Sequence, residues 1–126
     1  MKQKTPKKHN NLLSVFRIIE SNNNYSAVGS SGEYGAYQFM PLMWIAFSTM
    51  FFGVVLDITE PANQDKVAKA KVLKLIAQGL TDTQIAAFWN SGKVHDWETL
   101  QGVNRFGVPF NVAEYVNRFL RIKNQT

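Results

Sequence analysis

The chain has 126 residues and no cysteine, and 14 Lys and Arg residues against 9 Asp and Glu residues give it a formal net charge of +5. This length suits one domain, and the missing cysteines exclude disulfides, thiolate metal ligands and a cysteine nucleophile. Because only His9 and His95 could supply imidazole, we expect no metal site, no Ser-His-Asp triad and no cofactor.

The first ten residues are basic and contain no apolar residue after Met1, which predicts a flexible arm over 1–10 followed by one domain over 11–126. Positive charge of this kind favours polyanions such as nucleic acid, anionic lipid or the anionic polymers of cell envelopes. The apolar stretch behind the arm is interrupted by Arg17 and lacks a small-residue cleavage site, so we expect no signal peptide. Four lysines lie in the arm: Lys2, Lys4, Lys7 and Lys8.

Helix caps, prolines and glycines predict a mainly α architecture with almost no strands. The segment from Gly29 to Gly35, which is rich in glycine, predicts an irregular loop or a short hairpin. On the third helix the expected apolar stripe is Ala68, Val72, Leu73, Ile76 and Ala77. The first predicted helix runs from a cap at Asn10 or Asn11 to about Ser21, and the second from Pro41 to about Phe52, before Gly53. The third is capped by Thr59, has Pro61 in its first turn and ends before Gly79. Capping boxes at Thr81 and Asn111 start the last two, which run to Gly92 and to about Ile122.

A run of 17 uncharged residues extends from Met40 to Leu56. It is at the short limit for crossing a bilayer, and it contains Pro41 and Gly53. We therefore expect a buried helix pair in a small domain and no integral membrane segment.

Glu20 breaks a local rule, because it sits at the predicted end of the first helix directly after two isoleucines. The partial negative charge of a helix C-terminus disfavours an anion there by roughly 0.3–1 kcal/mol, and apolar neighbours add a desolvation cost. Both effects are expected to raise the pKa of the carboxyl group, as a general acid working near neutral pH requires. The alternative is a surface glutamate that turns to water or pairs with Arg17.

The residues around the glycine-rich loop suit a carbohydrate ligand. Tyr34 and Tyr37 offer aromatic faces that pack on sugar rings, with the alternative that they pack beneath the loop. Gln38 and Asn90 add amide side chains. No Lys-Ser or Lys-Thr pair follows Gly35, so the loop is not a phosphate-binding loop. One carboxyl group among amides and aromatic rings fits a polysaccharide better than a phosphate or a peptide.

The sequence contains, in order, Glu20-Ser21, Ala27-Val28, Gly32, Gly35-x-x-Gln38-x-Met40-Pro41, Asn90-x-Gly92 and Tyr115-Val116. Taken in order, these motifs resemble the soluble lytic transglycosylase domain, from about Leu12 to Ile122. The resemblance implies a mainly α, lysozyme-like fold of the goose-type lysozyme class, and cleavage of peptidoglycan. Trp89 and the stretch Pro61-x-Asn63-Gln64-Asp65 look more like a phage-encoded branch.

The resemblance also implies roles for single residues. Glu20 would be the one catalytic acid/base, protonating the glycosidic oxygen between N-acetylmuramic acid and N-acetylglucosamine and then accepting the proton of the muramoyl C6 hydroxyl, which closes a 1,6-anhydro ring. Ser21 would lie near the lactyl-peptide side. The remaining substrate-binding residues would be Gln38 with the backbone of Tyr37, then Asn90, and Tyr115, which would support Glu20.

The sequence departs from the family wording at three places. Ala36-Tyr37 stands where Leu-Met is usual, and Trp89 where Tyr is usual. Glu33 stands where Ala is usual and is a possible second carboxylate, which would make the protein a lysozyme-type hydrolase. The alternative is that Glu33 is a loop residue that faces solvent.

The resemblance implies peptidoglycan glycan strands as the partner, and no nucleic acid. We expect a monomer, or one part of a larger virion or secretion assembly. The site of action would be the bacterial cell wall, on the periplasmic or extracellular side, reached through a virion, a secretion machine or lysis. A non-catalytic glycan-binding module of such an assembly is the alternative from a different functional class.

Overall fold

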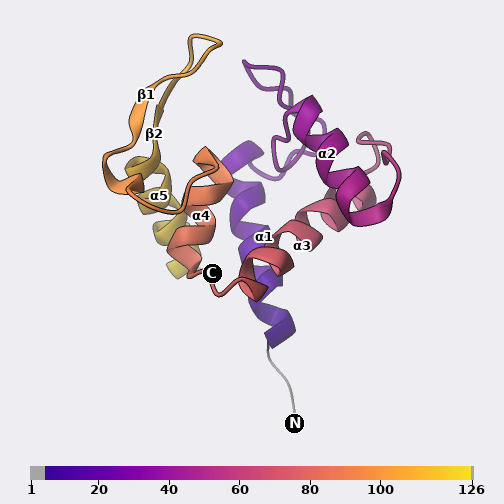
Figure 1. Cartoon of the computed structure of the whole chain (residues 1–126), viewed down its shortest axis with the longest axis horizontal. Coiled ribbons are helices and arrows are strands. Elements are labelled where there is room, and N and C mark those ends of the chain that lie inside the picture. Colours follow the sequence, from indigo (N-terminus) through magenta and orange to yellow (C-terminus); the bar gives the residue numbers. More distant parts are fainter. Residues whose placement is uncertain (1–4, 126) are drawn as a thin grey trace. The chain divides into compact units, whose positions relative to one another are not determined.

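The computed structural model describes residues 5–125, with side chains from residue 8 onward, and the described chain is mainly α (Figure 1). It has five α-helices and a short antiparallel hairpin of two strands. In chain order the elements are α1 (Thr5–Ser21), α2 (Pro41–Phe52), α3 (Pro61–Ala77), α4 (Asp82–Ser91), the 3-10 turn η1 (Trp97–Thr99), β1 (Gln101–Val103), β2 (Pro109–Asn111) and α5 (Val112–Asn124).

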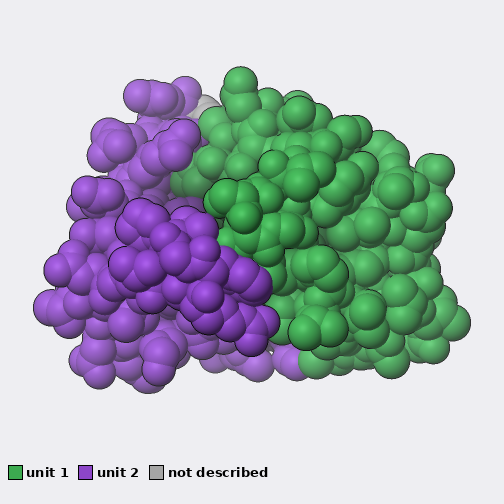
Figure 2. Space-filling view, turned by 90° about the horizontal axis from the view of Figure 1, so that it is seen from above, with its two compact units in different colours: residues 1–73 green, residues 74–126 purple. Residues whose placement is uncertain are grey.

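The chain divides into two compact units, residues 1–73 and residues 74–126 (Figure 2). The first unit contains α1, the glycine-rich loop, α2 and most of α3. The second contains the end of α3, α4, the hairpin and α5. The single domain over 11–126 stays a prediction.

The first helix starts earlier than the sequence predicted. α1 begins at Thr5, so the prediction of a start at Asn10 or Asn11 is wrong, and residues 5–10 of the predicted arm are helical. His9 explains part of this difference, because its side chain is only 7% exposed and extends the buried side of the helix by one turn. Lys2 and Lys4 lie outside the described residues.

Much of the core of the first unit is supplied by α1 and α3. α1 buries Leu12, Val15, Phe16 and Ile19 at helical spacing. On α3 the predicted stripe is partly wrong, because Leu73 is 40% exposed and Ala77 is also exposed. The side chains that α3 does bury are Gln64, Val67, Ala68, Val72 and Leu75.

α2 is far more exposed than its composition suggested. Among its residues only Trp44 and Ser48 are buried. The helix begins at Pro41 and ends before Gly53, as predicted, but the expected buried helix pair is wrong. Within residues 5–125 no helix is both long enough and apolar enough to cross a bilayer. Large apolar side chains are exposed along α2 and just after it: Leu42, Met43, Ile45, Met50, Phe52, Val54 and Val55.

The glycine-rich segment forms a tight loop held by two isolated antiparallel bridges, Val28 with Tyr34 and Tyr34 with Phe39. This agrees with the predicted loop or short hairpin. Phe39 then packs its ring 5.3 Å from that of Trp44, measured between centroids, and so ties the loop to α2.

The second unit contains the one pair of strands that sequence reasoning missed. α4 begins with the predicted capping box, in which Thr81 and Gln84 bond each other's backbone N–H groups. β1 and β2 pair Gln101 with Asn111 and Val103 with Pro109. Asn111 then caps α5 by accepting the N–H of Glu114 at 3.1 Å.

Candidate active site

Glu20 lies in the last turn of α1 and is partly exposed, so its carboxylate stands at the C-terminal end of a helix, as predicted. The helix ends sharply behind it because Asn22 and Asn23 adopt left-handed φ angles of 56° and 66°. Their N–H groups donate to the carbonyls of Ile18 at 3.0 Å and Arg17 at 2.9 Å. This ending satisfies carbonyls that the helix itself leaves without a partner.

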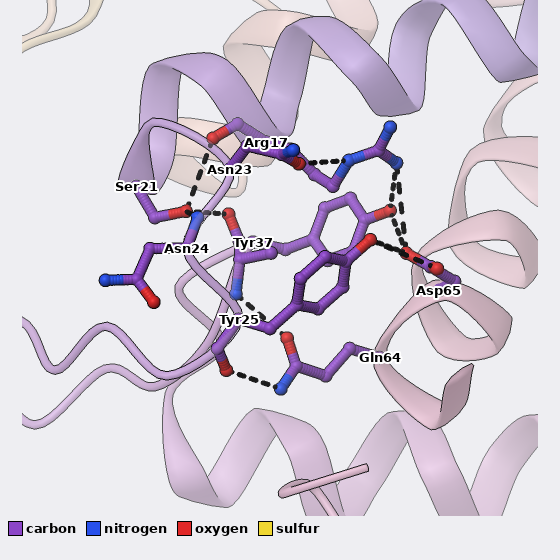
Figure 3. Close-up of polar contacts among 9 residues, drawn as sticks. Arg17, Ser21, Asn23, Asn24, Tyr25, Tyr37, Gln64 and Asp65 are labelled. Atoms are coloured by element: carbon purple, nitrogen blue, oxygen red, sulfur yellow. Dashed lines mark hydrogen bonds and ion pairs between the residues drawn. The ribbon is translucent and has the colours of Figure 1, made fainter. Parts of the chain in front are cut away.

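Ser21 joins the end of α1 to the glycine-rich loop (Figure 3). Its hydroxyl donates to the carbonyl of Ala36 at 2.9 Å and lies 3.3 Å from the carbonyl of Arg17. The same oxygen accepts the N–H of Asn24 at 2.9 Å. Ser21, which the sequence assigned to substrate binding, therefore also fixes the loop beside Glu20.

A polar cluster beneath the loop connects α1, the loop and α3 (Figure 3). Arg17, the alternative partner considered for Glu20, donates to the hydroxyl of Tyr37 at 2.8 Å and to Asn23 at 2.8 Å. The hydroxyls of Tyr37 and Tyr25 both donate to Asp65, at 2.6 Å and 2.9 Å. An Arg17 nitrogen lies 3.8 Å from the same carboxylate oxygen.

Tyr37 is therefore a buried anchor of the loop. Its side chain is 1% exposed, and burial, followed by its bond to Asp65, raises the pKa of its hydroxyl. The ring packs beneath the loop, which was the alternative for Tyr37. The family resemblance assigns a role in lining a glycan cleft to the backbone of Tyr37 and not to this ring.

Lys71 is the functional candidate that sequence reasoning missed. Its ammonium nitrogen lies 4.8 Å from the centroid of the Phe47 ring and 6.0 Å from that of Phe39. Burial lowers the pKa of Lys71 to about 8, and the negative charge of Glu20 offsets part of this shift. The Lys71 ammonium thus lies within the electrostatic influence of the candidate catalytic carboxylate.

A signal for Lys71 does exist in the sequence. Lys71 lies four residues after Val67 and four before Leu75, so it occupies a position on the buried stripe of α3. Gln64 begins the same stripe three residues before Val67. Polar residues at core positions of an otherwise apolar stripe indicate a specific partner. A correct prediction of the buried positions of α3 would therefore have singled out both Lys71 and Gln64.

Gln64 fastens the loop to α3 from below. It is fully buried, and its Oε1 accepts the N–H of Ala36 at 2.8 Å. Its Nε2 donates to the carbonyls of Tyr25 at 3.0 Å and Ile58 at 2.7 Å. Gly35 permits this contact, because it has a φ of +92° and a Cβ there would fall on the Gln64 amide.

Gln38 holds the loop from within. It has a left-handed φ of 54°, an uncommon conformation for a residue other than glycine. Its Nε2 donates to the carbonyls of Gly35 at 2.9 Å and Ala27 at 3.2 Å. The amide is partly exposed, so the position that the sequence assigned to substrate binding also carries structural bonds.

Glu33 points back into its own loop. Its Oε1 accepts the N–H of Ser31 at 2.7 Å, and a Cβ added to Gly29 would lie 2.5 Å from that oxygen. The carboxylate is partly exposed. Its contacts are those of a residue that shapes the loop.

Two further predicted residues meet in the second unit. Asn90 near the end of α4 and Tyr115 on α5 line one cavity of about 540 Å³. Glu114, Arg118 and Arg121 contribute charged groups to the same cavity, and sequence reasoning had assigned none of them to a site. Asn90 and Tyr115 thus share a hollow with polar walls on these two helices.

No protein-family model matches this chain, and no curated protein matches it. Within residues 5–125 no three His, Asp or Glu side chains gather in a group that could hold a metal ion.

Proposed function

We propose that this protein cleaves peptidoglycan as a lytic transglycosylase with a lysozyme-like, goose-type fold. The observation that carries the proposal is the placement of Glu20. A partly exposed carboxylate ends α1, and Ser21 bonds the glycine-rich loop directly beside it. A single carboxyl group with rigid surroundings is what an acid/base needs to act in both halves of a transglycosylation.

In the proposed reaction Glu20 gives a proton to the glycosidic oxygen between N-acetylmuramic acid and N-acetylglucosamine. The C6 hydroxyl of the muramoyl sugar attacks its own C1 and returns its proton to Glu20, so no water is consumed. Ser21, Gln38 and the Tyr37 backbone would contact the glycan on the loop side. As in the family that the sequence resembles, Asn90 and Tyr115 would take part in binding the glycan.

The proposed partner is therefore the glycan strand of the bacterial cell wall, and the proposed site of action is on its periplasmic or extracellular side. The net charge of +5 supports this choice, since a basic protein accumulates at an anionic surface.

Digestion of purified peptidoglycan tests the proposal, with the muropeptides analysed by mass. We expect 1,6-anhydro products, and a loss of at least ~10²-fold in rate for Glu20→Gln, the lower range for removal of a general acid–base group. An unchanged rate for Glu20→Gln would refute the site.

Glu33→Ala is the matched control. We expect it to keep most of the activity, because Glu33 is bonded within its loop. Reducing-end products together with a large loss for Glu33→Ala would favour a hydrolase with two carboxylates. Binding of glycan without any cleavage would favour the non-catalytic module.

A further inference from the structure

The cavity of the second unit has charged walls. It has a volume of about 540 Å³ and lies where α4, β2 and α5 come together, with α4 packed against α5 (Figure 1). Small ligands occupy pockets of roughly 300–1,000 Å³, so this cavity is large enough to hold one. Three of its charged residues belong to α5, namely Glu114, Arg118 and Arg121, and all three are exposed.

The fold makes no use of these three charges. Within the part of the chain that the structure describes, none of them forms an ion pair or a side-chain hydrogen bond, although Glu114 stands four residues before Arg118, a spacing at which opposite charges commonly pair on a helix. The ion pair between α4 and α5 joins Asp82 to Lys123 at 3.5 Å instead. The helix dipole accounts for an acid at the start of α5, but not for Arg118 in its middle.

The types and spacing of these charges indicate the ligand chemistry. Arg118 and Arg121 are three residues apart, so they are neighbours on the surface of α5. A guanidinium group binds a carboxylate through two parallel hydrogen bonds. Glu114 on the same wall attracts an ammonium group and repels a ligand that is densely negative. The cavity therefore suits a ligand with carboxylates and an amine better than it suits a polyphosphate.

The uncharged walls of the cavity suit a peptide. Phe110 and Tyr115 contribute aromatic rings, against which small apolar side chains pack. Asn90 and Asn117 contribute amides, and neither amide forms a hydrogen bond within the described residues. An amide side chain both donates and accepts, so it pairs with the N–H and the C=O of a peptide bond.

We propose that this cavity binds a short zwitterionic peptide, and that the peptide is the stem carried by the muramoyl sugars of peptidoglycan. Arg118 and Arg121 bind the free carboxylates of the stem, and Glu114 binds the amino group of its diamino acid. The choice of the stem rests on the proposed function, whereas the binding site rests on the cavity and its charges.

Binding of a synthetic stem peptide to the whole protein tests the site without any need for cleavage. The peptide is acylated at its amino terminus, as it is in peptidoglycan, and its affinity is measured by calorimetry. We expect Arg118→Gln and Arg121→Gln each to weaken binding by at least ~10-fold, the effect of losing a charged hydrogen-bonding partner. Arg105→Gln is the matched control and should leave the affinity unchanged, because Arg105 is an exposed cation of the same unit that does not line the cavity.

A second cycle of measurements tests Glu114. Glu114→Gln removes the charge but keeps a residue that suits the first turn of a helix. Acetylation of the diamino acid removes the other half of the same contact. We expect each change to weaken binding, and the two together to weaken it no more than one alone. Losses that add would overturn the role of Glu114.

Two further outcomes would overturn the zwitterionic ligand. One is tighter binding of inorganic polyphosphate than of the stem peptide, and the other is an equal loss of peptide binding in Arg105→Gln and Arg118→Gln. Both would show a general attraction of anions to a basic protein. Thermal unfolding of each variant shows whether the fold has survived the substitution.

Digestion separates this inference from the proposed function. Intact peptidoglycan is compared with peptidoglycan from which an amidase has removed the stems, and we expect Arg118→Gln to slow cleavage of the intact polymer more than that of the stripped one. Peptide binding as expected without any cleavage by the parent would refute the proposed function and leave the peptide site standing. Cleavage of both polymers to 1,6-anhydro products at equal rates, with no binding of the stem peptide, would overturn the peptide site and leave the proposed function standing.

Discussion

At the scale of single residues, His9 shows how a polar group has been placed in the core. Its side chain is 7% exposed, and its Nδ1 has no hydrogen-bond partner within the described part of the chain. Burial, and after it the positive charge of Lys69, lowers the pKa of this imidazole. The folded protein therefore holds His9 in its neutral form more strongly than the unfolded chain does.

This shift predicts a loss of stability in acid. Because the folded pKa lies below the unfolded value of about 6.5, the unfolded chain binds the proton first, and stability falls as the pH drops below that value. We expect the melting temperature to fall between pH 7.5 and pH 5, and to fall less in His9→Leu. Exposed His95 provides the control, since His95→Gln should show the same fall as the parent. An equal fall of the melting temperature in the parent and in His9→Leu would contradict the assignment of this acid effect to His9.

At the scale of elements, the glycine-rich loop is held by α3 as much as by its own turns. Gln64 bonds backbone groups on both sides of the loop, at Tyr25 and Ala36, and Gly35 leaves the space for its amide. A third bond joins Gln64 to the carbonyl of Ile58, ahead of α3. Ser21 adds a bond from α1 to the same stretch. The loop beside Glu20 is therefore rigid by construction, as an active-site loop must be to hold a ligand in one geometry.

Two glycines of this loop form a matched pair. Gly32 and Gly35 have φ angles of +91° and +92°, but a Cβ would be in open space at Gly32 and would strike Gln64 at Gly35. Both alanine variants lose roughly 1–2 kcal/mol from the left-handed backbone. We expect Gly35→Ala to lose about 2 kcal/mol more in urea unfolding, since the bonds of Gln64 are broken as well. Equal losses would show that Gln64 does not hold the loop.

Elements that are fixed by interactions between residues close in sequence could be predicted, and the others could not. The capping box at Thr81 and the turn after Ser21 were predictable because their bonds lie within a few residues. β1 was not, because all three of its residues are exposed and show no alternation. In the site, the end position of Glu20 follows from sequence, whereas its electrostatic influence on Lys71 depends on the tertiary fold of the first unit.

At the scale of the whole molecule, apolar residues and charges are distributed unusually. An uncharged helix of 12 residues, α2, turns most of its side chains to solvent, while the net charge of +5 is carried elsewhere. The mistaken prediction that this segment is buried has a simple cause. Hydrophobicity shows that a helix gains by burial, but a helix that is apolar all round does not reveal which side packs.

The exposed face of α2 should tolerate charge without loss of stability. Leu42 and Met50 are 70% and 57% exposed, and leucine, methionine and lysine have similar helix propensities. We expect the double variant Leu42→Lys/Met50→Lys to unfold within about 0.5 kcal/mol of the parent, as surface substitutions do, and to remain soluble at higher concentration because the apolar patch is interrupted. Trp44→Ala is the contrast, because Trp44 is 3% exposed and its indole N–H donates to the carbonyl of Leu56 at 2.7 Å; its loss should cost roughly 3–5 kcal/mol. Urea unfolding gives the free energy of unfolding of each variant, and solubility is measured beside it. A large destabilisation by the two lysines would mean that the outer face of α2 is buried.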